Sequence, residues 1–124
     1  MPYHVDRQSF ERLAEEALKS IPKRYLRNIR NLSVLVEDQP ADEDAEAVGV
    51  QKNELLGLFR GAGHAGAGFF DTPSPLPDAI ILYQKNIEAI CNSGRELVEE
   101  IRITIIHEVG HYFGLSDDEL SQYE

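Results

Sequence analysis

The sequence predicts an α+β fold, in which a short β-sheet packs against an N-terminal helix and a second, central helix near the C-terminus. Residues 6–20 repeat apolar side chains at helical spacing, and three short segments are rich in β-branched residues and leucine. A further helical pattern runs through 101–120. With 124 residues, the chain is expected to form one domain over 1–124.

Helix-capping and helix-ending residues predict the first elements of the chain. We expect the N-terminal helix over 6–20, with Asp6 as its cap and its apolar side against the sheet. Pro22 ends this helix and opens a short second one. The segment 32–37, LSVLVE, predicts the first strand, and we expect it at the centre of the sheet.

The middle of the chain is rich in loop-forming residues. The segment 38–46, DQPADEDAE, predicts an acidic surface loop, and its spacing matches no known calcium loop. A second strand is expected over 54–60, where Gly57 weakens the pattern. Residues 61–78 predict a loop around His64, which either faces water or stabilises an oxyanion. This loop lacks the Lys-Ser/Thr pair of a phosphate-binding loop.

The third strand is expected at 79–83, AIILY. Because it is the last strand before the central helix, we expect it to form a sheet edge, where an extended peptide can pair with free backbone groups. A short helix follows over 86–91 and includes Cys91, which we interpret as a small core residue. Ser93 is the expected cap of the long helix.

Composition limits the possible partners. The chain has 22 acidic and 12 basic residues and a net charge of −10, and no dense cluster of Lys or Arg, so nucleic-acid binding is not expected. No apolar run reaches the roughly eighteen residues of a membrane span, so no membrane partner is expected. The single cysteine and the lack of an export signal predict a cytoplasmic location. The sequence does not indicate an oligomeric state.

The motif with the clearest chemistry is His107-Glu108-x-x-His111. On a helix, two residues four apart lie about 40° apart around the axis and roughly 6 Å apart along it. Two imidazoles at this spacing can bind one zinc ion, and a catalytic zinc keeps one position for water. Glu108 is then close enough to take a proton from that water.

A third ligand must come from beyond the helix. Gly114 can adopt the left-handed conformation that ends a helix and reverses the chain, and Asp117 follows three residues later. We therefore rank Asp117 first as third ligand. Asp118 and Glu119 are alternatives, because Ser116 and Glu119 resemble a capping box that starts a last short helix.

The alternative for the histidines is a purely structural role, in which they are core residues satisfied by hydrogen bonds. The helix already has a wide apolar side, formed by Leu97, Val98, Ile101, Ile105, Val109, Tyr112 and Phe113. His107, Glu108 and His111 project beside this apolar side, and burying three such groups without a shared purpose is costly. The pattern therefore favours a metal site.

The stretch from His107 to Asp117 resembles the extended zinc motif of the zincin metallopeptidases, in the variant with aspartate as the third ligand. The order LSVLVE, LLGLFRG, AIILYQKNIEAIC, IIHEVGHYFGL also resembles the minimal zincins, a family of very small bacterial proteins. The resemblance implies a small mixed sheet flanked by helices, zinc on His107, His111 and Asp117, and Glu108 as general base. The methionine turn of the larger metzincins is not expected, since Met1 is the only methionine.

These features predict a zinc-dependent metallopeptidase that hydrolyses a peptide or protein substrate by a zinc-activated water. Tyr112 or His64 is a candidate for stabilising the oxyanion. Two alternatives remain open: a binding or regulatory module that keeps zinc without catalysis, and a zinc hydrolase that acts on a non-peptide amide.

Overall fold

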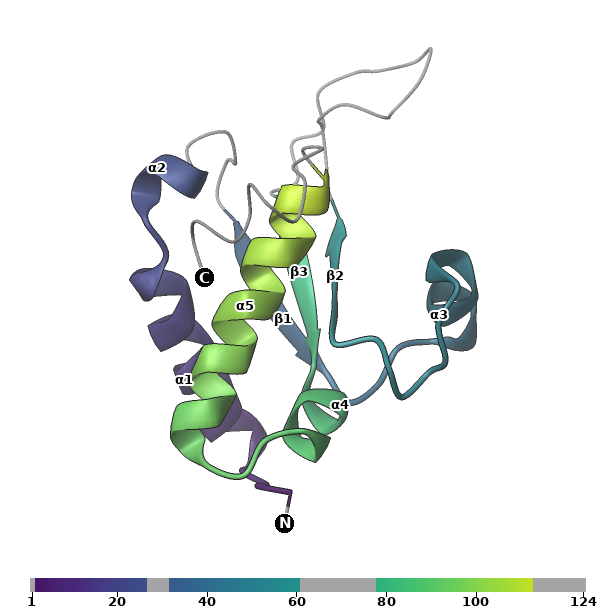
Figure 1. Cartoon of the computed structure of the whole chain (residues 1–124), viewed down its shortest axis with the longest axis horizontal. Coiled ribbons are helices and arrows are strands. Elements are labelled where there is room, and N and C mark those ends of the chain that lie inside the picture. Colours follow the sequence, from purple (N-terminus) through teal and green to yellow (C-terminus); the bar gives the residue numbers. More distant parts are fainter. Residues whose placement is uncertain (1, 27–31, 61–77, 113–124) are drawn as a thin grey trace.

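The computed structural model describes residues 2–26, 32–60 and 78–112. Along the chain the elements are α1 (Arg7–Ser20), α2 (Lys23–Leu26), β1 (Ser33–Glu37), α3 (Asp42–Val48), β2 (Gly57–Arg60), β3 (Ala79–Tyr83), α4 (Gln84–Ala89) and α5 (Gly94–Tyr112). Figure 1 shows α1 and α5 side by side in front of the sheet, with α3 beyond β2. The predicted α+β class is confirmed.

The three strands form a mixed sheet in the order β1-β3-β2. β1 pairs with β3 in parallel, with Val34 opposite Ile80, and β2 pairs with β3 antiparallel, with Phe59 opposite Ile80. Two predictions about strand order were therefore wrong: β1 is an edge strand, and β3 is the central one. The reason lies in burial, because a central strand is covered on both faces and reads as a continuous apolar run, as AIILY does.

The main core lies between the sheet and the pair of helices α1 and α5. Alternation along the strands sends Ile80 and Leu82 into this core and Ile81 and Tyr83 into a smaller cluster on the other face. α1 begins where predicted, because the Asp6 carboxylate accepts the Ser9 amide at 2.8 Å. The residues that α1 and α5 bury here include Phe10, Ala14, Ala17, Leu97, Ile101, Ile105, Ile106 and Val109.

The acidic segment expected to be a loop instead contains α3. Its first turn carries Asp42, Glu43 and Asp44, whose negative charges are favourable at the positive end of a helix. Gly49 ends the helix in the left-handed conformation, with φ of 88°. The loop prediction rested on the acidic charge and the proline of the segment, and did not include this local stabilisation of a short helix.

The second strand is shorter than predicted, because pairing starts only at Gly57. The chain before it is held by a side chain instead: the Asn86 amide donates to the carbonyls of Lys52 and Leu55, both at 2.8 Å. Asn86 lies on α4, which starts at Gln84, two residues before the predicted start. Cys91 is buried as predicted, and burial raises the pKa of its thiol to about 11.

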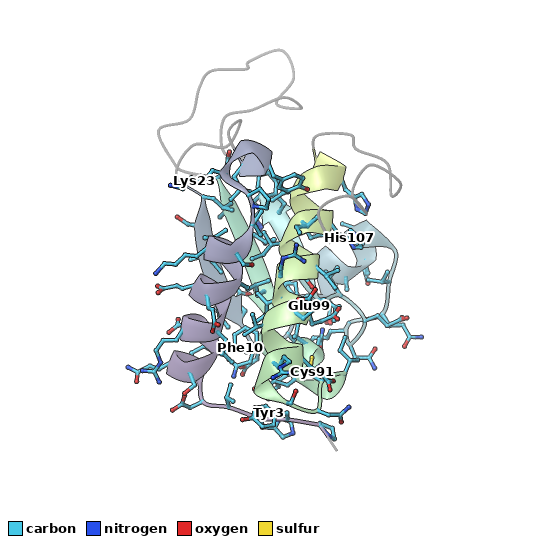
Figure 2. The ribbon with its side chains drawn as sticks, turned by 60° about the vertical axis from the view of Figure 1, so that its left-hand side comes forward. Tyr3, Phe10, Lys23, Cys91, Glu99 and His107 are labelled. Carbon is cyan, nitrogen blue, oxygen red and sulfur yellow. The ribbon has the colours of Figure 1, made fainter. Side chains whose placement is uncertain are left out.

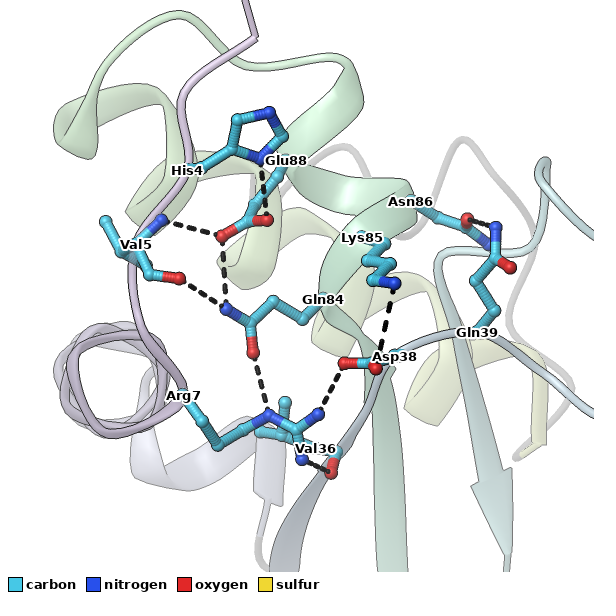
Figure 3. A network of polar contacts seen from close by, with 10 residues as sticks. All are labelled: His4, Val5, Arg7, Val36, Asp38, Gln39, Gln84, Lys85, Asn86 and Glu88. Carbon is cyan, nitrogen blue, oxygen red and sulfur yellow. Dashed lines mark hydrogen bonds and ion pairs between the residues drawn. The ribbon is translucent and has the colours of Figure 1, made fainter.

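A polar network fixes the N-terminal segment to α4 (Figure 3). The buried Glu88 carboxylate accepts hydrogen bonds from the Val5 amide at 2.9 Å, the Gln84 side-chain amide at 3.1 Å and the His4 imidazole at 3.1 Å. Gln84 in turn accepts a bond from Arg7 at 2.8 Å, and Arg7 pairs with the Asp38 carboxylate at 2.6 Å. These bonds join α1, α4 and the end of β1.

Several predictions fall on residues outside the described ranges, namely the loop 61–78 apart from Asp78, the continuation of the second helix beyond Leu26, and the last helix after Gly114. Among the helices that the structure describes, none combines the length and the apolar character needed to cross a lipid bilayer.

Candidate functional site

The candidate site is built on the second half of α5. The first turn of this helix is fixed by Ser93, as predicted: its hydroxyl accepts the Glu96 amide at 3.1 Å. The Glu96 carboxylate in turn accepts the Asn92 amide at 3.0 Å. With its start capped and its apolar side buried against α1 and the sheet, α5 carries the two histidines on a rigid element.

His107 and His111 lie on the same side of α5. Their ring centroids are 5.9 Å apart and their planes differ by only 10°. Figure 2 shows His107 near the end of α5 that is remote from Cys91 and Tyr3. The rings are stacked rather than convergent, so rotation about the side-chain torsions is needed to bring one nitrogen of each imidazole to a common zinc ion.

Glu108 lies between the two histidines in sequence and contacts the sheet. Burial raises the pKa of its carboxyl, while the nearby His111, a hydrogen bond from the Phe59 amide and the nearby His107 oppose this rise. The Phe59 bond connects Glu108 directly to β2. The carboxylate is therefore held in place by the backbone of a strand.

The pairing of β2 explains why the Phe59 amide points toward Glu108. The Tyr83 amide donates to the Leu56 carbonyl at 2.9 Å, so Leu56 belongs to a hydrogen-bonded pair of the ladder. In an antiparallel ladder such pairs alternate, which leaves the amide and carbonyl groups of Gly57 and Phe59 pointing away from β3. The outer edge of β2 thus faces the site.

Gly57 allows β2 to approach α5 closely. A Cβ atom at this position would lie 2.7 Å from the Thr104 methyl carbon and 3.0 Å from the Ile81 carbonyl oxygen. The glycine that weakened the strand pattern in the sequence is therefore required by packing. It brings β2 against Thr104, one helical turn before Glu108.

α2 supports the same part of α5 from the other side. The Tyr25 hydroxyl donates a short hydrogen bond to the carbonyl of Ile106, the residue before His107. This bond ties α2 to the turn of the helix that carries the first histidine. Tyr25 is therefore a positioning residue of the candidate site.

A cavity of about 200 Å³ opens beside His107 and Glu108, between α5 and the residues that lead into β2. Its other lining residues are Glu54, Leu55, Leu56, Gly57, Glu100, Ile103 and Thr104. A larger groove of about 400 Å³ lies between α1 and β1, but neither histidine lines it. The smaller cavity is the relevant one, because it adjoins the groups that carry the chemistry.

The remaining predicted site residues lie outside the described ranges: Asp117, the alternatives Asp118 and Glu119, and His64. The side chain of Tyr112 is also outside them. Within residues 2–26, 32–60 and 78–112, no group of three or more potential metal ligands is found. The part of the site that is described, two adjacent imidazoles on one side of α5, supplies two of the ligands that a zinc ion needs.

Glu100 and Thr104 were not recognised from the sequence as part of the site. A signal was present, since both lie one or two helical turns before His107 and Glu108 on α5 and therefore share a side of the helix with them. The prediction for this helix used its apolar side and the His107-Glu108-x-x-His111 motif, and did not consider the polar residues one and two turns earlier. Polar residues at helical spacing from the motif would have indicated the wall of the cavity.

A family model described as zincin-like metallopeptidase matches residues 29–124. No curated protein matches the chain. Among solved structures, the chain is similar to a conserved hypothetical protein from Thermo thermophilus, with a TM-score of 0.60 and 21% identity. The match covers 96% of this chain and 100% of the other, so the two share a fold over nearly their whole lengths.

Proposed function

This chain belongs to the zincin-like metallopeptidase family, and on that premise we propose that it hydrolyses peptide bonds with a zinc ion and Glu108 as general base. The observation that carries the proposal is the pair of parallel imidazoles, 5.9 Å apart, beside a glutamate that the Phe59 amide orients. The motif spacing and the family membership support the same assignment.

In this proposal His107, His111 and Asp117 hold the metal. When bound, zinc polarises a substrate carbonyl and lowers the pKa of a coordinated water from about 16 to about 7. The ligand set of two imidazoles and one carboxylate leaves a position for water, as in other catalytic zinc sites. Asp118 and Glu119 remain the alternatives to Asp117.

In the proposed reaction, Glu108 acts first as general base and then as general acid. It accepts a proton from the attacking water and donates it to the nitrogen of the departing amine, which is the usual double role of a general base in hydrolysis. A hydrogen bond from the Phe59 amide orients the carboxylate, and in this proposal its remaining hydrogen-bonding capacity serves the attacking water. Tyr112 and His64 are candidates for stabilising the oxyanion.

The edge of β2 supplies a place for an extended substrate. Its outward amide and carbonyl groups at Gly57 lie next to the cavity beside Glu108, and an added peptide strand pairs with such groups. The sequence predicted a sheet edge near the site, but assigned it to the wrong strand. The peptide is therefore proposed to pair with β2.

The test compares zinc-loaded wild-type protein with the Glu108→Gln variant on a mixture of peptides of diverse sequence. The variant should bind as much zinc as the wild type, measured by elemental analysis, and lose activity by about 10²- to 10⁴-fold, the usual contribution of general acid–base catalysis. Cleavage by the variant at the wild-type rate would contradict the proposed mechanism. Zinc-loaded wild type that cleaves no peptide would favour a binding role.

A further inference from the structure

The cavity beside the candidate site has an unusual charge. Three of its lining residues are glutamates, Glu54, Glu100 and Glu108, and none of the described residues that line it is a lysine or an arginine. Some carboxylates elsewhere in the described part of the chain are paired with cations, as Asp38 is with Arg7 at 2.6 Å and Asp44 with Arg60 at 3.1 Å. The cavity is therefore a local concentration of negative charge.

Glu100 is half-buried, as Glu108 is, whereas Glu54 is exposed. Within the described residues, no hydrogen bond or ion pair is found for the Glu100 carboxylate. Burial raises the pKa of Glu100, the neighbouring Glu99 adds to the rise, and His107 opposes it. A carboxylate in this state is stabilised by any cation that enters the cavity.

Thr104 adds a second, independent observation. The residue is only 6% exposed, and its hydroxyl oxygen has no hydrogen-bond partner among the described residues. Buried hydroxyl groups in folded proteins almost always have a partner. This oxygen is itself fully buried, so the Thr104 side chain must rotate before its hydroxyl can bind a polar group in the cavity.

The rest of the wall is apolar. Leu55, Leu56 and Ile103 line the cavity together with the glutamates. The volume of about 200 Å³ is below the roughly 300–1,000 Å³ of pockets for drug-sized ligands, so the cavity suits one side chain rather than a larger molecule. A long apolar stem with a charged end matches such a wall, and lysine and arginine have this shape.

We propose that this cavity binds a lysine or arginine side chain of the substrate, with Glu100 as the principal partner of the positive charge and Glu54 at the more exposed part of the wall. Because the cavity shares His107 and Glu108 with the candidate site, the selected residue lies next to the bond that is cleaved. This assignment of a basic substrate rests on the proposed peptidase function. It makes Glu100 a specificity-determining residue.

The first experiment measures binding, which requires no activity. Isotope-labelled wild-type protein is titrated with N-acetyl-lysine amide and with N-acetyl-norleucine amide, which has the same apolar stem without the amine. The lysine compound should bind about tenfold more tightly, equivalent to about 1.4 kcal/mol, and shift the backbone signals of Gly57 and Thr104. The preference should weaken at high salt, since the attraction is electrostatic. Equal affinities for the two compounds would overturn the proposal.

Matched variants locate the effect. Glu100→Gln should remove most of the lysine preference, whereas Glu99→Gln removes the same charge from the adjacent, exposed residue and should preserve it. Glu54→Gln provides a second test at an exposed position, where a folding defect is not expected, and should lower the preference about threefold. A preference that survives both Glu100→Gln and Glu54→Gln would rule out this cavity as its source.

The second experiment maps the bonds that zinc-loaded wild-type protein cleaves in a peptide mixture. Cleavage sites flanked by lysine or arginine are expected, with the flanking preference lost in Glu100→Gln. Cleavage without such a preference would overturn the basic specificity and leave the peptidase function intact. Lysine binding that depends on Glu100 but occurs without any cleavage would overturn the peptidase function and leave the cavity assignment intact.

Discussion

Two glutamates on neighbouring helices, Glu88 on α4 and Glu108 on α5, occupy opposite environments. Glu88 is 3% exposed, yet its pKa is lowered: burial alone would raise it, but the Val5 amide, Gln84 and His4 together outweigh that effect. Glu108 is less deeply buried, and its pKa is raised, because burial outweighs the two histidines and the Phe59 amide.

The comparison shows that burial alone does not tell a structural carboxylate from a functional one. Hydrogen-bond donors within the protein stabilise the charge of the Glu88 carboxylate, and the same hydrogen bonds stabilise the fold around it. Glu108 has fewer donors and adjoins a cavity, so part of its potential for hydrogen bonds is left for a water or a substrate. Among the described residues, Glu88 lies in a network closed by internal hydrogen bonds, which we call the saturated end, whereas Glu108 has one backbone donor, from Phe59.

The largest effect is expected from the metal ligands. His111→Ala should lower zinc affinity by at least about a hundredfold, because even the loss of a hydrogen bond to a zinc ligand costs about 10- to 100-fold. Competition with a chromophoric chelator measures the affinity. His4→Ala, at the saturated end, is the matched control and should leave it unchanged. Equal zinc affinity of wild type and His111→Ala would remove the distinction between the two ends.

Glu88→Gln should lower the free energy of unfolding at pH 7 by about 1.5–3 kcal/mol, the value of hydrogen bonds to a charged group. The pKa of Glu88 in the folded protein lies below its ordinary value of 4.5. The stabilisation by these hydrogen bonds is therefore complete above pH 4.5 and is lost as the pH falls through the folded-state pKa. Urea unfolding at pH 7 and at pH 3 should show a gap between wild type and variant that narrows in acid.

In the metal-free protein, Glu108→Gln is not expected to lower the free energy of unfolding, in contrast to Glu88→Gln. The raised pKa means that the ionised form of Glu108 is disfavoured in the folded state, so its replacement should not lower stability at pH 7. The same urea unfolding experiments measure the free energy of unfolding of this variant. A loss of stability equal to that of Glu88→Gln would show that the two glutamates have the same structural role.

Gly57→Ala should lower the free energy of unfolding by about 1–3 kcal/mol, because the added methyl group would lie 2.7 Å from the Thr104 side chain. The strand edge must then move away from α5, so hydrolysis should fall as well. Gly49→Ala is a useful control: it has no atom within 4 Å of the added carbon, and its cost arises only from the positive φ. Activity should be retained in Gly49→Ala and lost in Gly57→Ala.

The smallest effect is expected from Tyr25→Phe, which removes one hydrogen bond to the carbonyl of Ile106. Stability should fall by about 0.5–1.5 kcal/mol. If this bond positions the histidine turn, zinc affinity should fall in the same variant. A loss of stability with unchanged zinc affinity would assign Tyr25 to the fold alone.

The sequence predicted the parts of the molecule that depend on local patterns. The cap at Asp6, the strand at 79–83 and the long helix behind Ser93 were all correct, since each rests on residues within a few positions of one another. The predicted pair of histidines on one side of that helix is also found. The assignment of Asp117 as third ligand stays a prediction.

Features that depend on distant contacts were not predicted. The order of the strands was wrong, because the pattern of LSVLVE does not reveal which strand will lie beside it. The bond between His4 and Glu88 joins residues 84 positions apart, and no short-range signal indicates it. The same holds for the Phe59 amide and Glu108, whose contact arises only once β2 lies against α5.

The most direct test of the central claim is X-ray absorption spectroscopy of the zinc-loaded protein, which identifies the atoms around the metal. We predict two imidazole nitrogens at about 2.0–2.1 Å and oxygen ligands at about 2.0–2.2 Å, with one oxygen from water. A spectrum with fewer than two imidazoles would contradict the claim that His107 and His111 bind one zinc ion.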